Sequence, residues 1–138
     1  MKTSDPRPRE IRTGAAPAPV GPYSQAIRTG ELVFVSGQIP LDPGSGRSVE
    51  GEIEDEARQV IANLRTVLEA SGSGLDRVVR TTVYLTDLAL SPRVNAVYAE
   101  AFAAEPAPAR VTIGVAALPL GARIEIDAIA IATGEEAD

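Results

Sequence analysis

Only two segments of this chain show helical periodicity, whereas four others have the composition of β-strands, and this ratio limits the possible folds. Two helices are enough to cover one face of a sheet but not both, because each helix packs across only part of a face. The expected fold is therefore α+β, a single sheet with two helices on one face. The helices are expected at 52–70 and from 91 or 92 to before 105, and the strands at 31–39, 78–85, 111–115 and 123–132.

The first helix, Glu52–Ala70, has the strongest signal. Acidic residues crowd its first turns, where the helix dipole favours negative charge. The small residues 71–74 (SGSG) are expected to end it. An apolar stripe at helical spacing is formed by Ala57, Val60, Ile61, Leu64, Val67 and Leu68.

The last strand, 123–132, carries isoleucine on both faces. Successive side chains of a strand point to opposite faces, so Glu125 and Asp127 share one face with Ile129 and Ile131. That face is not simply polar, although the two helices are needed on the other face. A subunit interface on the helix-free face is the expected explanation.

The first 14 residues are polar and charged and are expected to form a flexible N-terminal arm. Residues 15–22 are too rich in proline for a helix or an inner strand, so they are expected to be extended. A chain of 138 residues suits one domain, and residues 15–138 are assigned to it. Deletion of residues 1–12 is expected to leave folding almost unchanged.

The chain contains no Cys, His or Trp, and Lys2 is its only lysine. The usual general base, the usual transition-metal ligands and a thiol nucleophile are therefore missing. A Schiff-base lysine would have to be Lys2, which lies in the polar N-terminal segment. No metal and no cofactor is expected. Catalysis would depend on carboxylates, Tyr or Ser hydroxyls, Arg, backbone groups and water.

The net charge of −6 argues against a nucleic-acid partner, because phosphate binding needs a basic surface. No stretch approaches the length of a membrane span, and the N-terminus lacks the apolar segment of a signal peptide. The expected location is the cytoplasm, with no membrane partner.

Four short motifs could carry chemistry, and each also has a structural interpretation. Tyr23 in GPYSQ fits a packing residue as well as a cleft residue. Ser36 and Gly37 fit a β-bulge or a close approach to a ligand. Arg110 follows a proline-rich break, where its planar guanidinium could grip a carboxylate or form a structural ion pair. Glu125 either faces solvent or sits in a pocket with a raised pKa.

In combination these motifs resemble the Rid family, the reactive intermediate deaminases also called YjgF-like proteins. The resemblance covers roughly residues 15–132. It rests on the motifs in order and at family spacing, each of which alone is weak. The matching segments are GPYSQAI at 21–27, VFVSGQIPLDPGSG at 33–46, EARQVIANLRTVLEASG at 56–72, VVRTTVYLTDL at 78–88, VNAVYAEAF at 94–102 and PARVTIGVAALPLGARIEIDAIA at 108–130.

The resemblance implies a chorismate-mutase-like fold and a homotrimer with clefts between subunits. It implies that Arg110 clamps the substrate carboxylate and that Glu125 positions or activates water. Asp127, where many members have Glu, is placed outside the site. The implied cleft residues are Tyr23, Ser36, Gly37, Asn95 and the backbone of Thr112, where many members have Cys.

The implied reaction is hydrolysis of small, carboxylate-bearing imines or enamines to 2-keto acids and ammonia. An imine is already electrophilic, so positioning and one proton relay suffice. Two alternatives stay open at this point. One is a non-catalytic trimeric binding or regulatory protein, and the other is a pathway-specific enamine deaminase such as an aminomuconate deaminase. Ribonuclease activity is least favoured, because the chain is acidic and lacks His.

Overall fold

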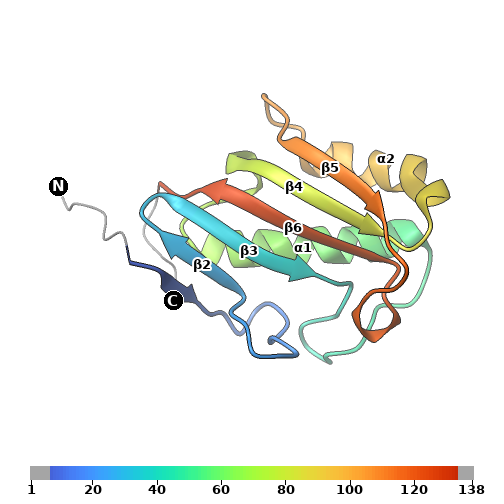
Figure 1. Ribbon diagram of the computed structural model, residues 1–138, viewed down its shortest axis with the longest axis horizontal. Coiled ribbons are helices and arrows are strands. Elements are labelled where there is room, and N and C mark those ends of the chain that lie inside the picture. Colours follow the sequence, from blue (N-terminus) through green and yellow to red (C-terminus); the bar gives the residue numbers. More distant parts are fainter. Residues whose placement is uncertain (1–6, 134–138) are drawn as a thin grey trace.

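The computed structural model describes residues 7–133 as a single mixed sheet with two helices (Figure 1). The helices are α1 (Ile53–Ala70) and α2 (Ser91–Ala101). The strands are β1 (Arg9–Ile11), β2 (Ala26–Thr29), β3 (Leu32–Gln38), β4 (Val78–Leu85), β5 (Ala109–Gly114) and β6 (Ile124–Ile131).

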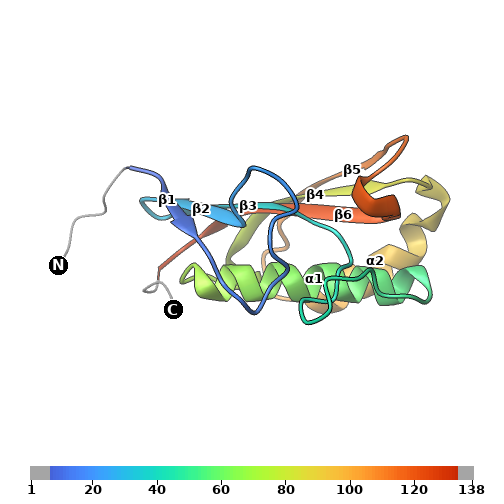
Figure 2. The ribbon, with the colours of Figure 1, turned by 90° about the horizontal axis from the view of Figure 1, so that it is seen from below.

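The sheet has the strand order β1-β2-β3-β6-β4-β5. Every neighbouring pair is antiparallel except β4 and β5, which are parallel and joined through α2. Parallel neighbours need such a crossover, because a tight turn reverses the chain direction. Both helices lie on the same face of the sheet (Figure 2). The expected α+β architecture, with one sheet and two helices on one face, is confirmed.

The apolar stripe of α1 forms the core together with the inward residues of the sheet. The helix begins with a capping box, in which Asp55 Oδ2 accepts a hydrogen bond from the Glu52 backbone N–H at 3.0 Å. Val60 and Leu64 of α1 and Ile124 and Ile126 of β6 are completely buried. Every second residue of β6 therefore points toward the helices.

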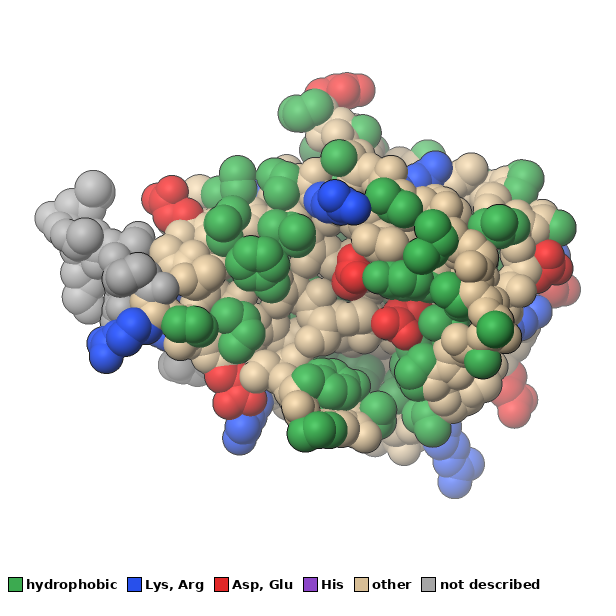
Figure 3. Space-filling view, viewed as in Figure 1, with side chains coloured by type: hydrophobic (Ala, Val, Ile, Leu, Met, Phe, Trp, Pro, Cys, Tyr) green, Lys and Arg blue, Asp and Glu red, His purple; other side chains and the backbone are tan. Residues whose placement is uncertain are grey.

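The opposite face of the sheet is uncovered within the described residues, and hydrophobic side chains gather on it (Figure 3). Side chains of this face include Leu32, Phe34, Val111, Ile113 and Ile131, each 37–43% exposed. Soluble proteins seldom leave such contiguous apolar area in contact with water. The expected subunit interface on this face stays a prediction, which the pattern of exposure supports.

Strands β1 and β2 correct the sequence analysis, which expected neither of them. The assignment of residues 1–14 to a flexible arm is wrong for β1, which pairs with β2 and buries Ile11 to 3% exposure. The segment after β1 is tied to Gln25, whose Oε1 accepts from Thr13 N at 2.7 Å and whose Nε2 donates to Thr13 O at 3.0 Å. A three-residue strand with one apolar side chain is too short for a periodicity signal. Residues 1–6 of the predicted arm lie outside the described residues.

Ile11→Ala is expected to destabilise the fold by about 2–4 kcal/mol, because it empties a site in the main core. The expectation that residues 1–12 can be removed harmlessly is replaced by this one. Arg12→Ala is the matched control, since the Arg12 side chain is exposed and forms a surface ion pair with Glu10. Urea denaturation of both variants measures the difference. Equal midpoints for the two variants would show that β1 contributes nothing.

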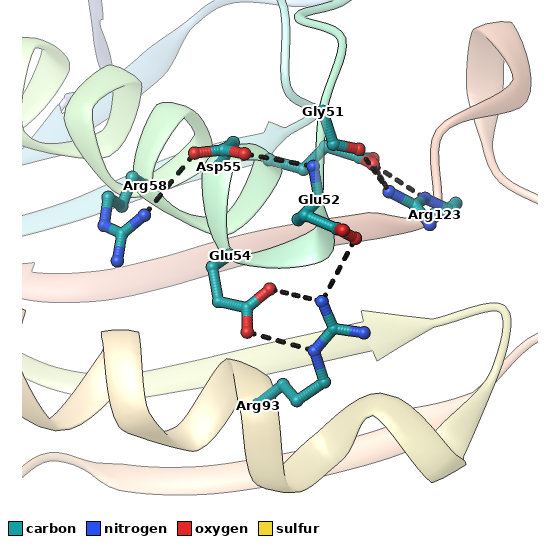
Figure 4. Close-up of polar contacts among 8 residues, drawn as sticks. Gly51, Glu52, Glu54, Asp55, Arg58, Arg93 and Arg123 are labelled. Atoms are coloured by element: carbon teal, nitrogen blue, oxygen red, sulfur yellow. Dashed lines mark hydrogen bonds and ion pairs between the residues drawn. The ribbon is translucent and has the colours of Figure 1, made fainter.

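Two arginines fix α2 and the segment before β6 to the start of α1 (Figure 4). Arg93 of α2 donates to Glu54 Oε1 at 2.7 Å and to Glu52 Oε2 at 3.2 Å. Arg123 pairs with Glu56 and donates to the Gly51 carbonyl at 3.1 Å. The contacts of Arg93 join α2, which carries part of the candidate site, to the start of α1.

Candidate active site

Glu125 lies on the helix-free face of β6, where its carboxyl group is packed against the backbone of Gly37. A Cβ atom on Gly37 would lie 1.9 Å from Glu125 Oε2, so only glycine fits at this position without moving Glu125. The pairing of β3 with β6 is irregular between Val35 and Gln38, and this irregularity brings Gly37 beside the carboxyl group. The bulge interpretation of this Ser-Gly pair is therefore confirmed, whereas the approach of a ligand to it stays a prediction.

The pKa of Glu125 is raised, first because the carboxyl group is partly buried and second because Asp127 carries a negative charge nearby. A carboxyl group with a raised pKa exchanges protons more readily near neutral pH than an ordinary glutamate. Glu125 is therefore chemically suited to act as an acid or a base.

Ser36 and Tyr23 lie next to Gly37. The Ser36 hydroxyl donates to the Ser24 carbonyl at 2.6 Å, so it anchors the loop that carries Tyr23. The Tyr23 hydroxyl accepts from Val20 N at 3.2 Å, and its side chain is 47% exposed. Tyr23 and Gly37 line one small hollow of about 20 Å³. We call Tyr23, Ser36, Gly37 and Glu125 the Glu125 half-site.

Arg110 lies on the edge strand β5 and is oriented by α2. Its guanidinium donates to Asn95 Oδ1 at 2.8 Å and lies over the Tyr98 ring, 4.8 Å from the centroid. The ring is itself fixed, because the Tyr98 hydroxyl hydrogen-bonds to Thr81 at 2.7 Å. Within residues 7–133 no carboxylate forms an ion pair with Arg110. Thr112 follows two residues later on the same face, and we call Asn95, Arg110 and Thr112, with Tyr98, the Arg110 half-site.

The sequence analysis did not identify Tyr98 as a site residue. The available signal was its spacing from Asn95, because residues three apart share a helix face. A tyrosine at that spacing can contact the same side chain as Asn95. The structure shows that both contact the same guanidinium.

The two half-sites do not meet within one chain. Glu125 is opposite Tyr84 of β4, which is opposite Ile113 of β5, so Arg110 is two strands and three residues away. These offsets are about 10 Å across the strands and about 10 Å along them. The two side chains also lie on opposite faces, because Arg110 contacts α2 whereas Glu125 lies on the face without helices.

Comparison with known proteins places the chain in a family. The profile of the family described as Endoribonuclease L-PSP matches residues 13–132. The chain is 50% identical over 120 residues to a RutC family protein of Pyrococcus horikoshii, covering 87% of this chain and 94% of that one. It is 46% identical over 121 residues to the mouse protein named 2-iminobutanoate/2-iminopropanoate deaminase, covering 88% and 89%. The chain belongs to the Rid family.

A solved structure of the same fold is that of TdcF of Escherichia coli with bound serine. Its TM-score is 0.85 at 35% identity, with 91% of this chain and 99% of that chain covered. The expected resemblance to the Rid family is confirmed by these matches. The ligand of that structure is an amino acid, so it carries a carboxylate.

Neither a metal site nor a membrane span emerges from the described part of this Rid family chain. No group of three or more His, Cys, Asp or Glu side chains in residues 7–133 could hold a metal ion. No described helix is both long enough and apolar enough to cross a membrane.

Gly37→Ala is expected to leave the protein folded but, with an imine substrate of the kind the family resemblance implies, to lower turnover at least about tenfold. The new methyl group would clash with the flexible end of Glu125, which can move aside at little cost in stability. The carboxyl group would then leave its position, and misplacement of a catalytic group is costly. Gly14→Ala is the matched control, because a Cβ at Gly14 meets no atom within 4 Å. Turnover with an imine substrate and thermal unfolding measure the two effects. Wild-type turnover in Gly37→Ala would contradict the expected role of Glu125.

Proposed function

We propose that this protein hydrolyses small 2-imino acids to 2-keto acids and ammonia. The observation that carries the proposal is Arg110, which is oriented by an amide and an aromatic ring yet has no carboxylate partner within the described residues. A guanidinium held in this way is prepared to bind an external carboxylate through two parallel hydrogen bonds. The mouse relative named as a 2-iminobutanoate/2-iminopropanoate deaminase supports the same substrate class.

The working site in this proposal lies between two copies of the chain in a homotrimer. One copy contributes the Arg110 half-site and its neighbour contributes the Glu125 half-site. Two observations support this arrangement. The half-sites face away from each other within one chain, and the helix-free face that carries Glu125 is unusually apolar. A closed ring, in which each copy contacts the next through two different surfaces, accounts for both observations.

Binding begins at the substrate carboxylate. Arg110 holds both carboxylate oxygens, and Asn95 fixes the plane of the guanidinium through its hydrogen bond. The backbone of Thr112 supplies a further polar contact on the same edge strand. This fixed carboxylate directs the neighbouring imine carbon toward the Glu125 half-site of the adjacent copy, which reduces the entropic cost of the reaction.

Glu125 then moves the protons of the hydrolysis. Its ionised form takes a proton from a water molecule, whose oxygen attacks the carbon of the protonated imine, so that a neutral carbinolamine forms. Glu125 gives this proton to the carbinolamine nitrogen. The carbon–nitrogen bond then breaks while Glu125 takes the proton of the hydroxyl group, so that the carbonyl of the 2-keto acid forms, ammonia leaves, and Glu125 passes its proton to the departing ammonia. The raised pKa of Glu125 suits both directions of transfer.

The proposal is tested with 2-iminopropanoate generated in the cuvette by an amino acid oxidase. The expected result is faster release of ammonia and pyruvate than in buffer, where imines hydrolyse spontaneously. An equal mass of an unrelated protein is the control. A rate equal to that of the control would contradict the deaminase proposal and favour the non-catalytic binding protein.

A further inference from the structure

Asp127 lies two residues beyond Glu125 on the same strand face, and contacts from β4 hold it in place. Its Oδ2 accepts from the Tyr84 hydroxyl at 2.9 Å, and its Oδ1 accepts from Thr82 N at 3.2 Å. Both donors belong to β4, so Asp127 leans toward β4. Glu125 leans the other way, toward Gly37 of β3. The two carboxyl groups therefore diverge from neighbouring positions.

Tyr84 also occupies the position directly opposite Glu125 in the pairing of β4 with β6. Side chains in opposed positions have Cβ atoms about 5 Å apart. The tyrosine ring therefore flanks Glu125 while its hydroxyl extends to Asp127. Glu125 therefore lies between the position of Tyr84 on β4 and the Gly37 backbone of β3.

We propose that Tyr84 and Asp127 form a positioning pair that keeps the Glu125 carboxyl group against Gly37, where it can face a bound imine. The role assigned to Glu125 rests on the proposed function, whereas the contacts of the pair do not. Neither Tyr84 nor Asp127 touches the substrate in this arrangement. Both act through Glu125.

The charged groups around Glu125 allow the effect of the pair to be measured through the pKa of Glu125. Asp127 is its neighbour on the same face of β6, and Tyr84 is opposite it on β4. Ser36 and Gly37 of β3 are uncharged, and Tyr23 completes the Glu125 half-site. Arg80 lies further along β4, where it lines a groove of about 290 Å³ together with Asp127. The negative charge of Asp127 adds to burial in raising the pKa of Glu125. Removal of that charge is therefore expected to let Glu125 ionise at lower pH.

The direct test is an NMR titration of the Glu125 side-chain carboxyl carbon. In Asp127→Asn, which keeps an acceptor for Tyr84, the midpoint is expected to move to lower pH than in the wild type. Glu69→Gln is the matched control, because it removes one carboxylate from the exposed side of α1 and should leave the midpoint unchanged. An unchanged midpoint in Asp127→Asn would overturn the proposal, whether or not the protein is a deaminase.

Kinetics supply the second test. The low-pH limb of kcat for imine hydrolysis is expected to move to lower pH in Asp127→Asn. Tyr84→Phe is expected to lower kcat about tenfold with little change in KM, because it removes one hydrogen bond to a charged group. An unaltered kcat in folded Tyr84→Phe of wild-type oligomeric mass would exclude Tyr84 from the pair. A wild-type protein without imine hydrolysis would contradict the proposed function alone, and the titration would still decide the pair.

Discussion

Arg110→Ala is expected to lower kcat/KM for 2-iminopropanoate by about 100-fold or more while leaving the fold intact. Each charge-assisted hydrogen bond to a carboxylate contributes roughly 1.5–3 kcal/mol, and the side chain would make two of them. Their loss also removes the orientation of the imine carbon. The fold should survive because the Arg110 side chain is exposed and makes no ion pair within residues 7–133.

Two further variants make this result specific. Arg110→Lys is expected to recover little, because an ammonium cannot reproduce the planar fork. Arg65→Ala removes an exposed arginine from α1 and is expected to keep wild-type turnover. The assay is ammonia release, with circular dichroism as the folding control. Turnover at the wild-type level in folded Arg110→Ala would refute the assignment of the carboxylate site.

Glu125→Gln is expected to lower kcat by about 10²–10⁴-fold, because the amide keeps the shape of the side chain but cannot accept the proton. Affinity for a non-reacting 2-keto acid should change little, since Arg110 supplies the carboxylate contact. Calorimetric titration with pyruvate measures that affinity. A Glu125→Gln protein that binds and turns over like the wild type would show that another group moves the protons.

The expected difference in stability between Glu125→Gln and the wild type has a defined sign. The folded state raises the pKa of Glu125, so the wild type loses stability relative to its acid form as pH rises through that pKa. The glutamine variant carries no such ionisation. It is therefore expected to unfold at the same temperature as the wild type at a pH below the ordinary pKa of a glutamate, and at a higher temperature at neutral pH. Its loss of turnover would not reflect unfolding.

The sequence predicts the parts of the fold whose signal is long. Eighteen residues of α1 carry a continuous apolar stripe, and the eight residues of β6 are rich in isoleucine, so both elements emerge from local sequence signals. Strands β1 and β2 have three and four residues, which is too few for a pattern. Their position depends on pairing with β3, and pairing is a tertiary property that local propensity does not encode.

The candidate site, like the fold, is predicted from the sequence only in part. Arg110 and Glu125 stand out locally, as an arginine after a proline-rich break and a carboxylate within an apolar strand, but their expected roles are implied by the resemblance to the Rid family. Their placement on opposite faces depends on strand order and register, which the sequence alone does not supply. The contact of Tyr84 with Asp127 joins residues 43 positions apart in the chain and depends on the same register.

The most direct test of a site shared between two copies is complementation between Arg110→Ala and Glu125→Gln. Equal amounts of the two inactive variants are unfolded and refolded together, and imine hydrolysis is then measured. Recovery of about a quarter of the wild-type rate is predicted, because one in four random neighbour pairings joins an intact Arg110 to an intact Glu125. Each variant refolded alone should stay inactive. No recovery in mixed oligomers of wild-type mass would show that both residues act within one chain, and would contradict the shared site.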